Sequence, residues 1–206
     1  MVSVYDLKPR FQALLRPLCI AAARAGITAN MVTLAAMALS IVIGALLLAI
    51  NSPVVLLLLP ATLFIRMALN AIDGMLAREH GQKSALGALL NEIGDVVSDA
   101  ALYLPLAVAL HAFSVPAWLV VLFVLCAMLT EFAGVAAALI GATRRYDGPM
   151  GKSDRAAAIG LLATILALGA PGGWWIDLVF FILTLLAALT VINRCRGALA
   201  ERTGNP

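Results

Sequence analysis

Residues 66–99 read RMALNAIDGMLAREHGQKSALGALLNEIGDVVSD, and this stretch sets both the fold and the site. It places asparagines and carboxylates inside sequence that is otherwise apolar. Ionisable groups are costly within a membrane span, and they are rare there unless they serve a function. The innermost of these polar residues are Asn70, Asp73, Asp95 and Asp99. They lie too deep to be explained as interfacial residues, so they predict a polar pocket.

Helical spacing places these residues on one face of each of two helices. Asn70 and Asp73 are three residues apart, and Asn91, Asp95 and Asp99 follow at intervals of four. Residues three or four apart lie on the same side of a helix. Because a short turn joins the two helices, they are antiparallel neighbours and their polar faces can converge. Oxygen ligands without sulfur or imidazole suit hard cations such as Mg²⁺ or Mn²⁺.

The composition excludes a disordered chain and argues against a soluble one. Of the 206 residues, 63% are hydrophobic and 12% are charged, and mean hydropathy is +1.03. Soluble domains carry about 25% charged residues. A spanning helix needs about 20 apolar residues. We therefore predict an all-α integral membrane protein with six transmembrane helices, at 31–50, 54–79, 86–111, 116–141, 154–169 and 174–193.

The loop charges predict the orientation. Lysine and arginine occur before the first predicted span and after the last, and in the second and fourth connections, whereas the other three connections have none. Basic loops stay in the cytoplasm. Six spans with both termini cytoplasmic satisfy this rule at every loop. The polar pocket then opens to the cytoplasm from a multi-pass protein of the inner membrane.

Residues 1–24 are predicted to form a separate interfacial amphipathic segment before the transmembrane domain of residues 25–206. Apolar residues alternate there with Lys8, Arg10 and Arg16. That pattern is typical of a helix lying among lipid headgroups. A solvated basic tail is the alternative.

The polar stretch resembles the signature of a known family. Asp73-Gly74-x-x-Ala77-Arg78 and, after eight residues, Gly87-x-x-x-Asn91-x-x-x-Asp95 are similar to DxxDGxxAR-x8-GxxxDxxxD of the CDP-alcohol phosphotransferases. Residues 26–33, GITANMVT, resemble the PNxxT segment of that family, with alanine in place of proline. The resemblance covers nearly the whole chain.

The resemblance implies phosphatidyl transfer in phospholipid biosynthesis. A CDP-linked lipid, first of all CDP-diacylglycerol, would give its phosphatidyl group to a small alcohol and release CMP. Asp95 matches the general base of the family. The implied metal ligands are Asp73, Asp95, Asn70 and Asn91. The implied contacts to the nucleotide and pyrophosphate are Asn30, Thr33, Gly74, Ala77, Arg78 and Gly87. The family also implies a homodimer among membrane lipids, and no nucleic-acid partner is expected.

Asn70 and Asn91 stand where the family has aspartates. An asparagine offers one neutral carbonyl oxygen and cannot bridge two cations as a carboxylate can. The site could therefore hold one or two Mg²⁺ or Mn²⁺ ions. A catalytically silent relative that binds nucleotide lipid or scaffolds a partner is the main alternative function, and a small transporter is the weaker one.

Residues 144–155, RRYDGPMGKSDR, are the second stretch of the sequence that indicates a binding site. Basic residues flank a glycine-rich turn before a predicted helix, and a helix start near basic residues is a natural anion site. The segment resembles the acceptor-binding loop of relatives that use phosphorylated acceptors, which implies acceptor binding by Lys152, Arg155 and Arg144. Glycerol 3-phosphate is the first acceptor expected and inositol phosphate the second. The alternative is that the basic residues of this loop only fix the orientation of the protein in the membrane and bind no ligand.

Overall fold

The computed structural model describes residues 8–50 and 52–204, and these residues form helices and loops without a β-strand. The helices are α1 (Lys8–Arg24), α2 (Ala29–Ala49), η2 (Pro53–Leu57), α3 (Leu58–Glu79), α4 (Ala85–Tyr103), α5 (Leu106–Ala109), η3 (Leu110–Phe113), α6 (Ala117–Ala136), η4 (Ala137–Ile140), α7 (Lys152–Ala167) and α8 (Trp174–Arg202). The η elements are short 3₁₀ turns. The all-helical prediction is confirmed.

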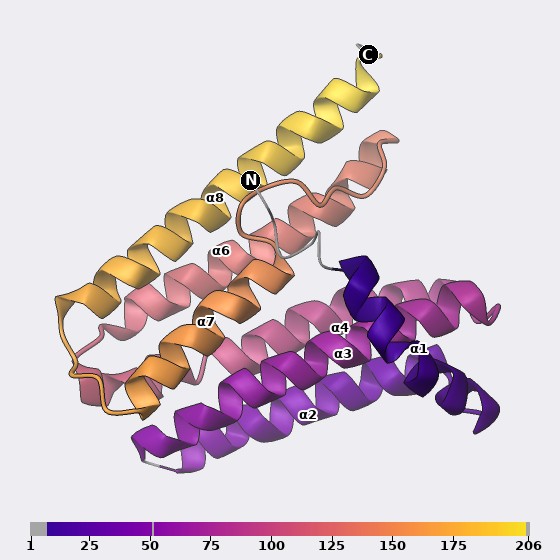
Figure 1. The fold of residues 1–206 in the computed structure, drawn as a ribbon. Coiled ribbons are helices and arrows are strands. Elements are labelled where there is room, and N and C mark those ends of the chain that lie inside the picture. The colour runs from indigo at the N-terminus through magenta and orange to yellow at the C-terminus, as the bar shows by residue number, and fades with distance from the viewer. Residues whose placement is uncertain (1–7, 51, 205–206) are drawn as a thin grey trace.

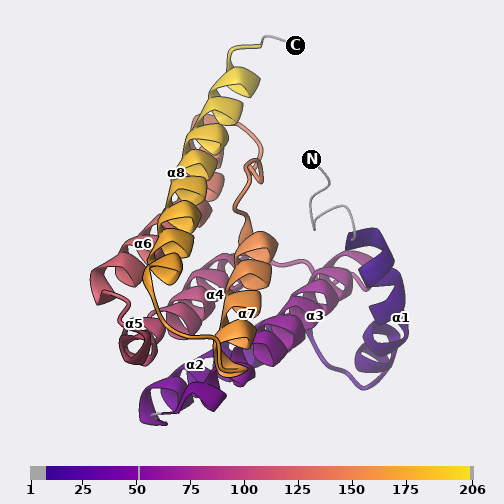
Figure 2. The same ribbon diagram turned by 60° about the vertical axis from the view of Figure 1, so that its left-hand side comes forward.

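The helices form two groups that α7 and α4 connect. α2 packs against α3 and α4, and α6 packs against α8. α7 lies against α3 and η2, while α4 contacts α6 (Figures 1 and 2). The two motif helices therefore run through the middle of the assembly, where helices from both halves of the chain can reach them.

Five of the helical segments are long and apolar enough to cross a membrane. They are Ala29–Ala49, Pro53–Glu79, Ala85–Phe113, Ala117–Ile140 and Trp174–Arg202. The fifth predicted span, 154–169, corresponds to α7, which has 16 residues and is shorter than the roughly 20 that a span needs. The number of spans, six, and the cytoplasmic placement of both termini stay predictions.

The N-terminal segment is helical from Lys8, and residues 1–7 of the predicted interfacial segment lie outside the described residues. α1 contains Pro17 and packs against α3. Leu15 and Cys19 are buried in this contact, whereas Leu14 and Leu18 are exposed. Exposed leucines beside basic residues suit a lipid interface. The interfacial location of α1 stays a prediction.

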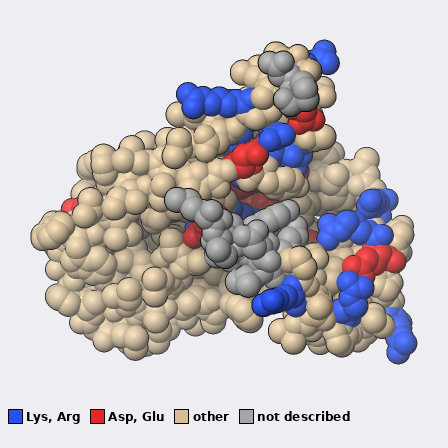
Figure 3. All heavy atoms as spheres, turned by 45° about the horizontal axis from the view of Figure 1, so that its top comes forward, with Lys and Arg blue, Asp and Glu red and all other residues tan. Residues whose placement is uncertain are grey.

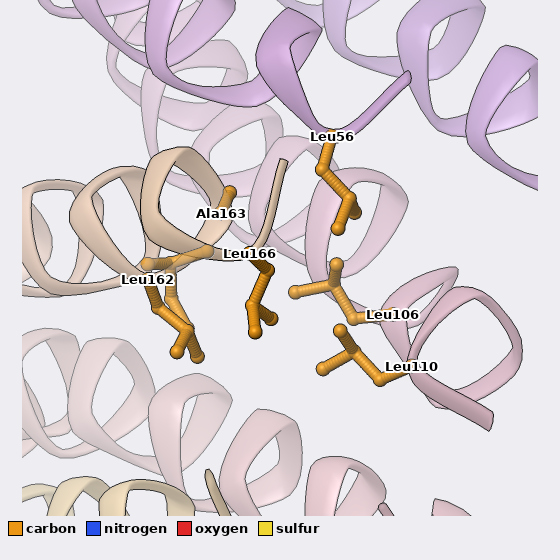
Figure 4. A pocket seen from close by; sticks show the side chains of 7 residues that line it. Leu56, Leu106, Leu110, Leu162, Ala163 and Leu166 are labelled. Carbon is orange, nitrogen blue, oxygen red and sulfur yellow. The ribbon is translucent and has the colours of Figure 1, made fainter. Parts of the chain in front are cut away.

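The two ends of the bundle differ in chemistry. One end holds the main apolar core, in which Phe123 packs edge-on against Phe180 at a centroid distance of 5.7 Å. A small cavity in this core is lined only by Leu56, Leu106, Leu110, Ile159, Leu162, Ala163 and Leu166 (Figure 4). The space-filling view shows charged side chains gathered over the other end (Figure 3). The charged end is therefore where a polar ligand can bind.

Candidate active site

The turn between α3 and α4 fixes the register of the two motif helices. Gly81 adopts a φ of +68°, which glycine accepts without strain. Ser84 then caps α4, because its Oγ accepts a hydrogen bond from the Gly87 amide at 2.9 Å. The Ala29 amide donates to Gln82 Oε1 at 2.6 Å and ties the turn to the start of α2. Three helices thus meet at the charged end.

Each motif asparagine pairs with an aspartate of the opposite helix. Asn70 Nδ2 on α3 donates to Asp95 Oδ1 on α4 at 3.1 Å. Asn91 Nδ2 on α4 donates to Asp73 Oδ2 on α3 at 3.5 Å. The convergence expected from the helical spacing is confirmed by these two contacts. The assignment of all four residues as metal ligands stays a prediction.

Asp73 also receives a hydroxyl from α2. Thr33 Oγ1 lies 2.8 Å from Asp73 Oδ2, and the carboxylate is 4% exposed. Thr33 was expected to contact the nucleotide, and the structure places it beside the aspartate at the core of the motif. This contact brings a third helix into the pocket.

The small motif residues let neighbouring polar side chains lie close to the helix backbone. A Cβ on Gly87 would lie 2.8 Å from Asn30 Oδ1, so no side chain fits there without movement. A Cβ on Gly74 would lie 3.1 Å from both terminal nitrogens of Arg78, whose side chain reaches back over that glycine. Ala77 is half-buried on the same helix. Their contacts with nucleotide stay predictions.

Asp95 is held by two cations in addition to Asn70. Lys152 Nζ, at the first residue of α7, lies 2.5 Å from Asp95 Oδ2. Arg66 Nη2 donates to the Asp95 backbone carbonyl at 3.1 Å and lies 3.4 Å from Oδ1. The loop residue expected to bind the acceptor therefore reaches the expected general base.

A second layer of ion pairs lies one helical turn deeper. Asp99 accepts from Arg66 Nη1 at 2.5 Å and from Arg155 Nη2 at 2.7 Å. Arg155 is fully buried, and it also donates to Glu131, to Thr130 Oγ1 and to the Met150 carbonyl. Asp99 and Arg155 thus connect α3, α4, α6 and α7.

The N–H donors of Arg155 all contact groups of the protein itself, and its expected contact with the acceptor stays a prediction. A guanidinium has five N–H donors. Nε and Nη2 serve Asp99, Nη2 also serves Glu131, and Nη1 serves Thr130 and Met150. All five donors are satisfied inside the protein, so the structure offers none of them to an acceptor and shows Arg155 as a brace between helices.

Glu131 is the centre of a cluster of arginines. Its carboxylate lies 2.8 Å from Arg155 Nη2, 3.2 Å from Arg144 Nη2 and 3.6 Å from Arg194 Nη1. Arg144, the third expected acceptor ligand, also pairs with Glu92 at 2.5 Å. No role for Glu92, Glu131 or Asp99 followed from the sequence, although the cost of a carboxylate in an apolar helix signalled that each needs a partner.

The loop before α7 is fastened to α8. Arg145 pairs with Asp147 at 2.7 Å and with Glu201 at 2.9 Å. The hydrogen bonds from Arg145 lower the pKa of Asp147 below its usual range. Gly148 has a φ of +119°, and a Cβ there would lie 2.7 Å from Thr190 Cα. Only glycine fits so close to the α8 backbone, which explains the glycine spacing noticed in the sequence.

The donor chemistry of the motif fits a hard divalent cation. The described residues contain no group of three or more His, Cys, Asp or Glu side chains gathered to hold a metal. Mg²⁺, however, is usually held by one or two carboxylates, with substrate phosphates and water completing the octahedron. Asp73 and Asp95 supply two carboxylates, and the carbonyl oxygens of Asn70 and Asn91 become available if their amides rotate.

An all-helical bundle with apolar helices of membrane length and an oxygen-rich site at one end has the architecture of a membrane-embedded enzyme. The family model for CDP-alcohol phosphatidyltransferase matches residues 26–193. The chain therefore belongs to the CDP-alcohol phosphatidyltransferase family, and this membership makes it a phosphotransferase.

Individual relatives agree with this assignment. Inner membrane protein YnbA of Escherichia coli (strain K12) is 49% identical over 198 residues, which cover 96% of this chain and 97% of that protein. Crystal structures of the phosphatidylinositol phosphate synthase of Mycobacterium tuberculosis are also similar. The complex with manganese and citrate has a TM-score of 0.70 at 18% identity and covers 92% of this chain and 91% of that one. The structure with CDP-DAG bound has a TM-score of 0.71 at 17% identity, with 92% and 96% covered. At such identities the structural likeness shows a shared fold.

Proposed function

We propose that this protein transfers a phosphatidyl group from CDP-diacylglycerol to a small alcohol and releases CMP, as a step of phospholipid biosynthesis. The observation that carries the proposal is the pair of buried carboxylates on the facing motif helices: Asp73, bonded to Asn91, and Asp95, bonded to Asn70 and to the Lys152 ammonium. A related protein whose structure contains CDP-DAG supports the choice of donor.

The location proposed for the reaction is the cytoplasmic face of the inner membrane. The apolar helices and the relative that is called an inner membrane protein support this location. The gathering of charge at one end, where the motif lies, supports an opening toward the headgroups (Figure 3). A homodimer is part of the proposal by family resemblance.

Asp73 and Asp95, with the carbonyls of Asn70 and Asn91, would hold Mg²⁺ or Mn²⁺. A relative with manganese in its structure supports this choice of ion. When bound, the cation neutralises the pyrophosphate of the donor, which is a large share of the work in phosphoryl transfer. The nucleotide and pyrophosphate would lie against Asn30, Thr33, Gly74, Ala77, Arg78 and Gly87.

Asp95 is the proposed general base. Its carboxylate takes the proton of the acceptor hydroxyl as the oxygen forms a bond to the phosphorus that carries diacylglycerol. The bond from that phosphorus to the bridging oxygen breaks, and CMP leaves with this oxygen. Lys152 and Arg66 hold the Asp95 carboxylate in place. Lys152 and Arg144 are the proposed acceptor contacts. Arg155 supports them through its ion pairs with Asp99 and Glu131, one helical turn deeper in the bundle.

The test is metal-dependent CMP release by the purified protein in lipid nanodiscs. With radiolabelled CDP-diacylglycerol, an alcohol and Mn²⁺, the wild type should release CMP, and Asp95→Asn should lower the rate by at least about 100-fold. Asp177→Asn is the matched control, because Asp177 lies in the first turn of α8, at the apolar end. Equal rates for the two variants would contradict the assignment of the base.

A catalytically silent relative is the second candidate, and Asn70 and Asn91 are the observation that favours it. Two carboxylates fewer than in the family signature weaken the attraction for cations. Such a protein would bind CDP-diacylglycerol, yet no alcohol or metal would give CMP. The same assay, combined with a donor-binding measurement, separates the two candidates.

A further inference from the structure

Five cations and five carboxylates share the charged end of the bundle. The cations are Arg66, Arg144, Lys152, Arg155 and Arg194, and the carboxylates are Asp73, Glu92, Asp95, Asp99 and Glu131. Each of these cations has a carboxylate oxygen within 3.6 Å. These ten groups are therefore balanced in charge among themselves before any ligand enters, and Arg78 of the motif is not one of them.

Glu131 produces much of this balance. It is the one charged residue between Ala100 and Thr143, it is 5% exposed, and it lies on α6 facing α7 and α8. An isolated buried carboxylate is very costly. Ion pairs with Arg155, Arg144 and Arg194 compensate for that cost, so these arginines are committed to a residue of the protein itself.

Arginine is the residue best suited to bind a phosphate group, because its planar fork donates two parallel hydrogen bonds. In this cluster many of those donors already bind protein groups, although Arg144 Nη1 has no hydrogen-bond partner among the described residues. Arg155 has all five donors satisfied, as described above. Arg194 contacts Glu131 and the Thr130 carbonyl through Nη1 and the Asp147 carbonyl through Nε. A phosphate monoester here would have to displace the Glu131 carboxylate or lie next to it.

Little positive charge would remain for the acceptor once the divalent cation and the donor are bound. A divalent cation at Asp73 and Asp95 would be matched by the two negative charges of the donor pyrophosphate. Lys152 would then be the one ammonium released from Asp95, and it is a single point charge. A phosphate monoester carries a charge of about −1.5 to −2 at neutral pH. Arg144 Nη1 is buried without a hydrogen-bond partner among the described residues, and its two N–H groups can donate to hydroxyl oxygens.

We infer that the acceptor is an uncharged alcohol without a phosphate group, and that Glu131 sets this specificity. The inference rests on the proposed function and reverses the acceptor order expected from the sequence. The hydroxyl of a neutral polyol needs hydrogen-bonding groups and a base, and the pocket supplies both. A second anion beside Glu131 would be repelled, and such like-charge contacts are a strong means of rejecting a wrong ligand.

The first test compares acceptors with the wild-type protein in nanodiscs, with CDP-diacylglycerol and Mn²⁺. CMP release should be supported by glycerol or myo-inositol, with kcat/KM at least about tenfold above the values for glycerol 3-phosphate and inositol phosphate. Preference for the phosphorylated alcohols would overturn the inference and leave the proposed function standing. Absence of CMP release with every acceptor would instead refute the proposed function.

The second test measures binding and does not depend on turnover. Glu131→Gln keeps the shape of the side chain and removes its charge, so glycerol 3-phosphate should bind about tenfold more tightly than to wild type by calorimetry. Glu201→Gln is the matched control, because it releases Arg145 on the outer loop and should change nothing. Equal affinity in wild type and Glu131→Gln would overturn the inference.

If Glu131→Gln fails to fold, the titration of wild type decides the question. Wild type should bind glycerol 3-phosphate with a Kd weaker than about 1 mM. Binding tighter than this value would show that the arginines accept a phosphate in spite of Glu131, and the inference would be rejected.

Discussion

The charged end and the apolar end of this bundle are held together by different interactions. At the apolar end, leucine, alanine and aromatic side chains fill the space between α5, α6, α7 and α8. At the charged end, Asp99 and Glu131 connect five helices, α3, α4, α6, α7 and α8, through buried arginines. Apolar packing tolerates the loss of part of one contact, whereas a buried ion network leaves an uncompensated charge when one member is removed. The proposed active site lies at this charged end.

Asp99→Asn should cause the largest loss of stability. It removes the charge that Arg66 and Arg155 share and leaves both guanidiniums underneutralised in a buried site. Breaking a buried pair in this way costs about 3–5 kcal/mol. Thermal unfolding in detergent, followed by the fluorescence of a thiol probe, would measure the change. Glu201→Gln should lose far less, because its ion pair lies on the surface.

Phe123→Ala tests the apolar end and should cost about 3 kcal/mol. Phe123 is fully buried between Tyr103 and Phe180, so its removal leaves a cavity lined by rigid neighbours. The loss should not depend on salt, and metal affinity should stay unchanged. A loss of Mn²⁺ binding in Phe123→Ala would show that the two ends are coupled more tightly than their contacts indicate.

The double substitution Asn70→Asp with Asn91→Asp compares this site with the four-aspartate signature of the family. In the present structure each asparagine amide donates to an aspartate across the helix pair. Two added carboxylates should tighten Mn²⁺ binding by about tenfold or more, because each adds Coulomb attraction in a partly dry pocket. Electron paramagnetic resonance would count the ions, and Asp73→Asn should weaken binding. Unchanged affinity would show that the asparagines do not face the cation.

Much of the fold followed from hydrophobic pattern and turn residues. The predicted helices at 31–50 and 54–79 agree with α2 and with η2 and α3 to within a few residues, because Thr28 and Pro53 mark where they begin. The predicted helix 86–111 is interrupted instead. It ends as α4 at Tyr103 and continues after Pro105 as two short turns. The hydropathy pattern does not show this break, because both sides of it are apolar, but Pro105 is a sequence signal for it, since proline cannot donate the helical hydrogen bond.

The site was predictable where it depends on spacing within two neighbouring helices. Asn70, Asp73, Asn91 and Asp95 meet because intervals of three and four residues place them on facing sides of a short hairpin. The contacts of Glu131 could not be predicted in this way. Its partners come from α7, α8 and the preceding loop, and the rotation of α6 toward them is set by tertiary packing.

The smallest expected effect concerns pH and the outer ion pairs. Hydrogen bonds from Arg145 lower the pKa of Asp147 in the folded protein, so folding favours the ionised carboxylate. This stabilisation is present above the unfolded pKa of about 3.9 and is lost as pH falls through the folded value. Because the Asp147 side chain is 42% exposed, the contribution should be only about 0.3 kcal/mol. Asp147→Asn should therefore differ slightly from wild type in thermal stability at pH 7, and the difference should decrease as the pH falls below the unfolded pKa. A difference that persisted at low pH would mean that the carboxylate acts through packing of the loop on α8, and the surface pair would then resemble the buried network more closely than its exposure suggests.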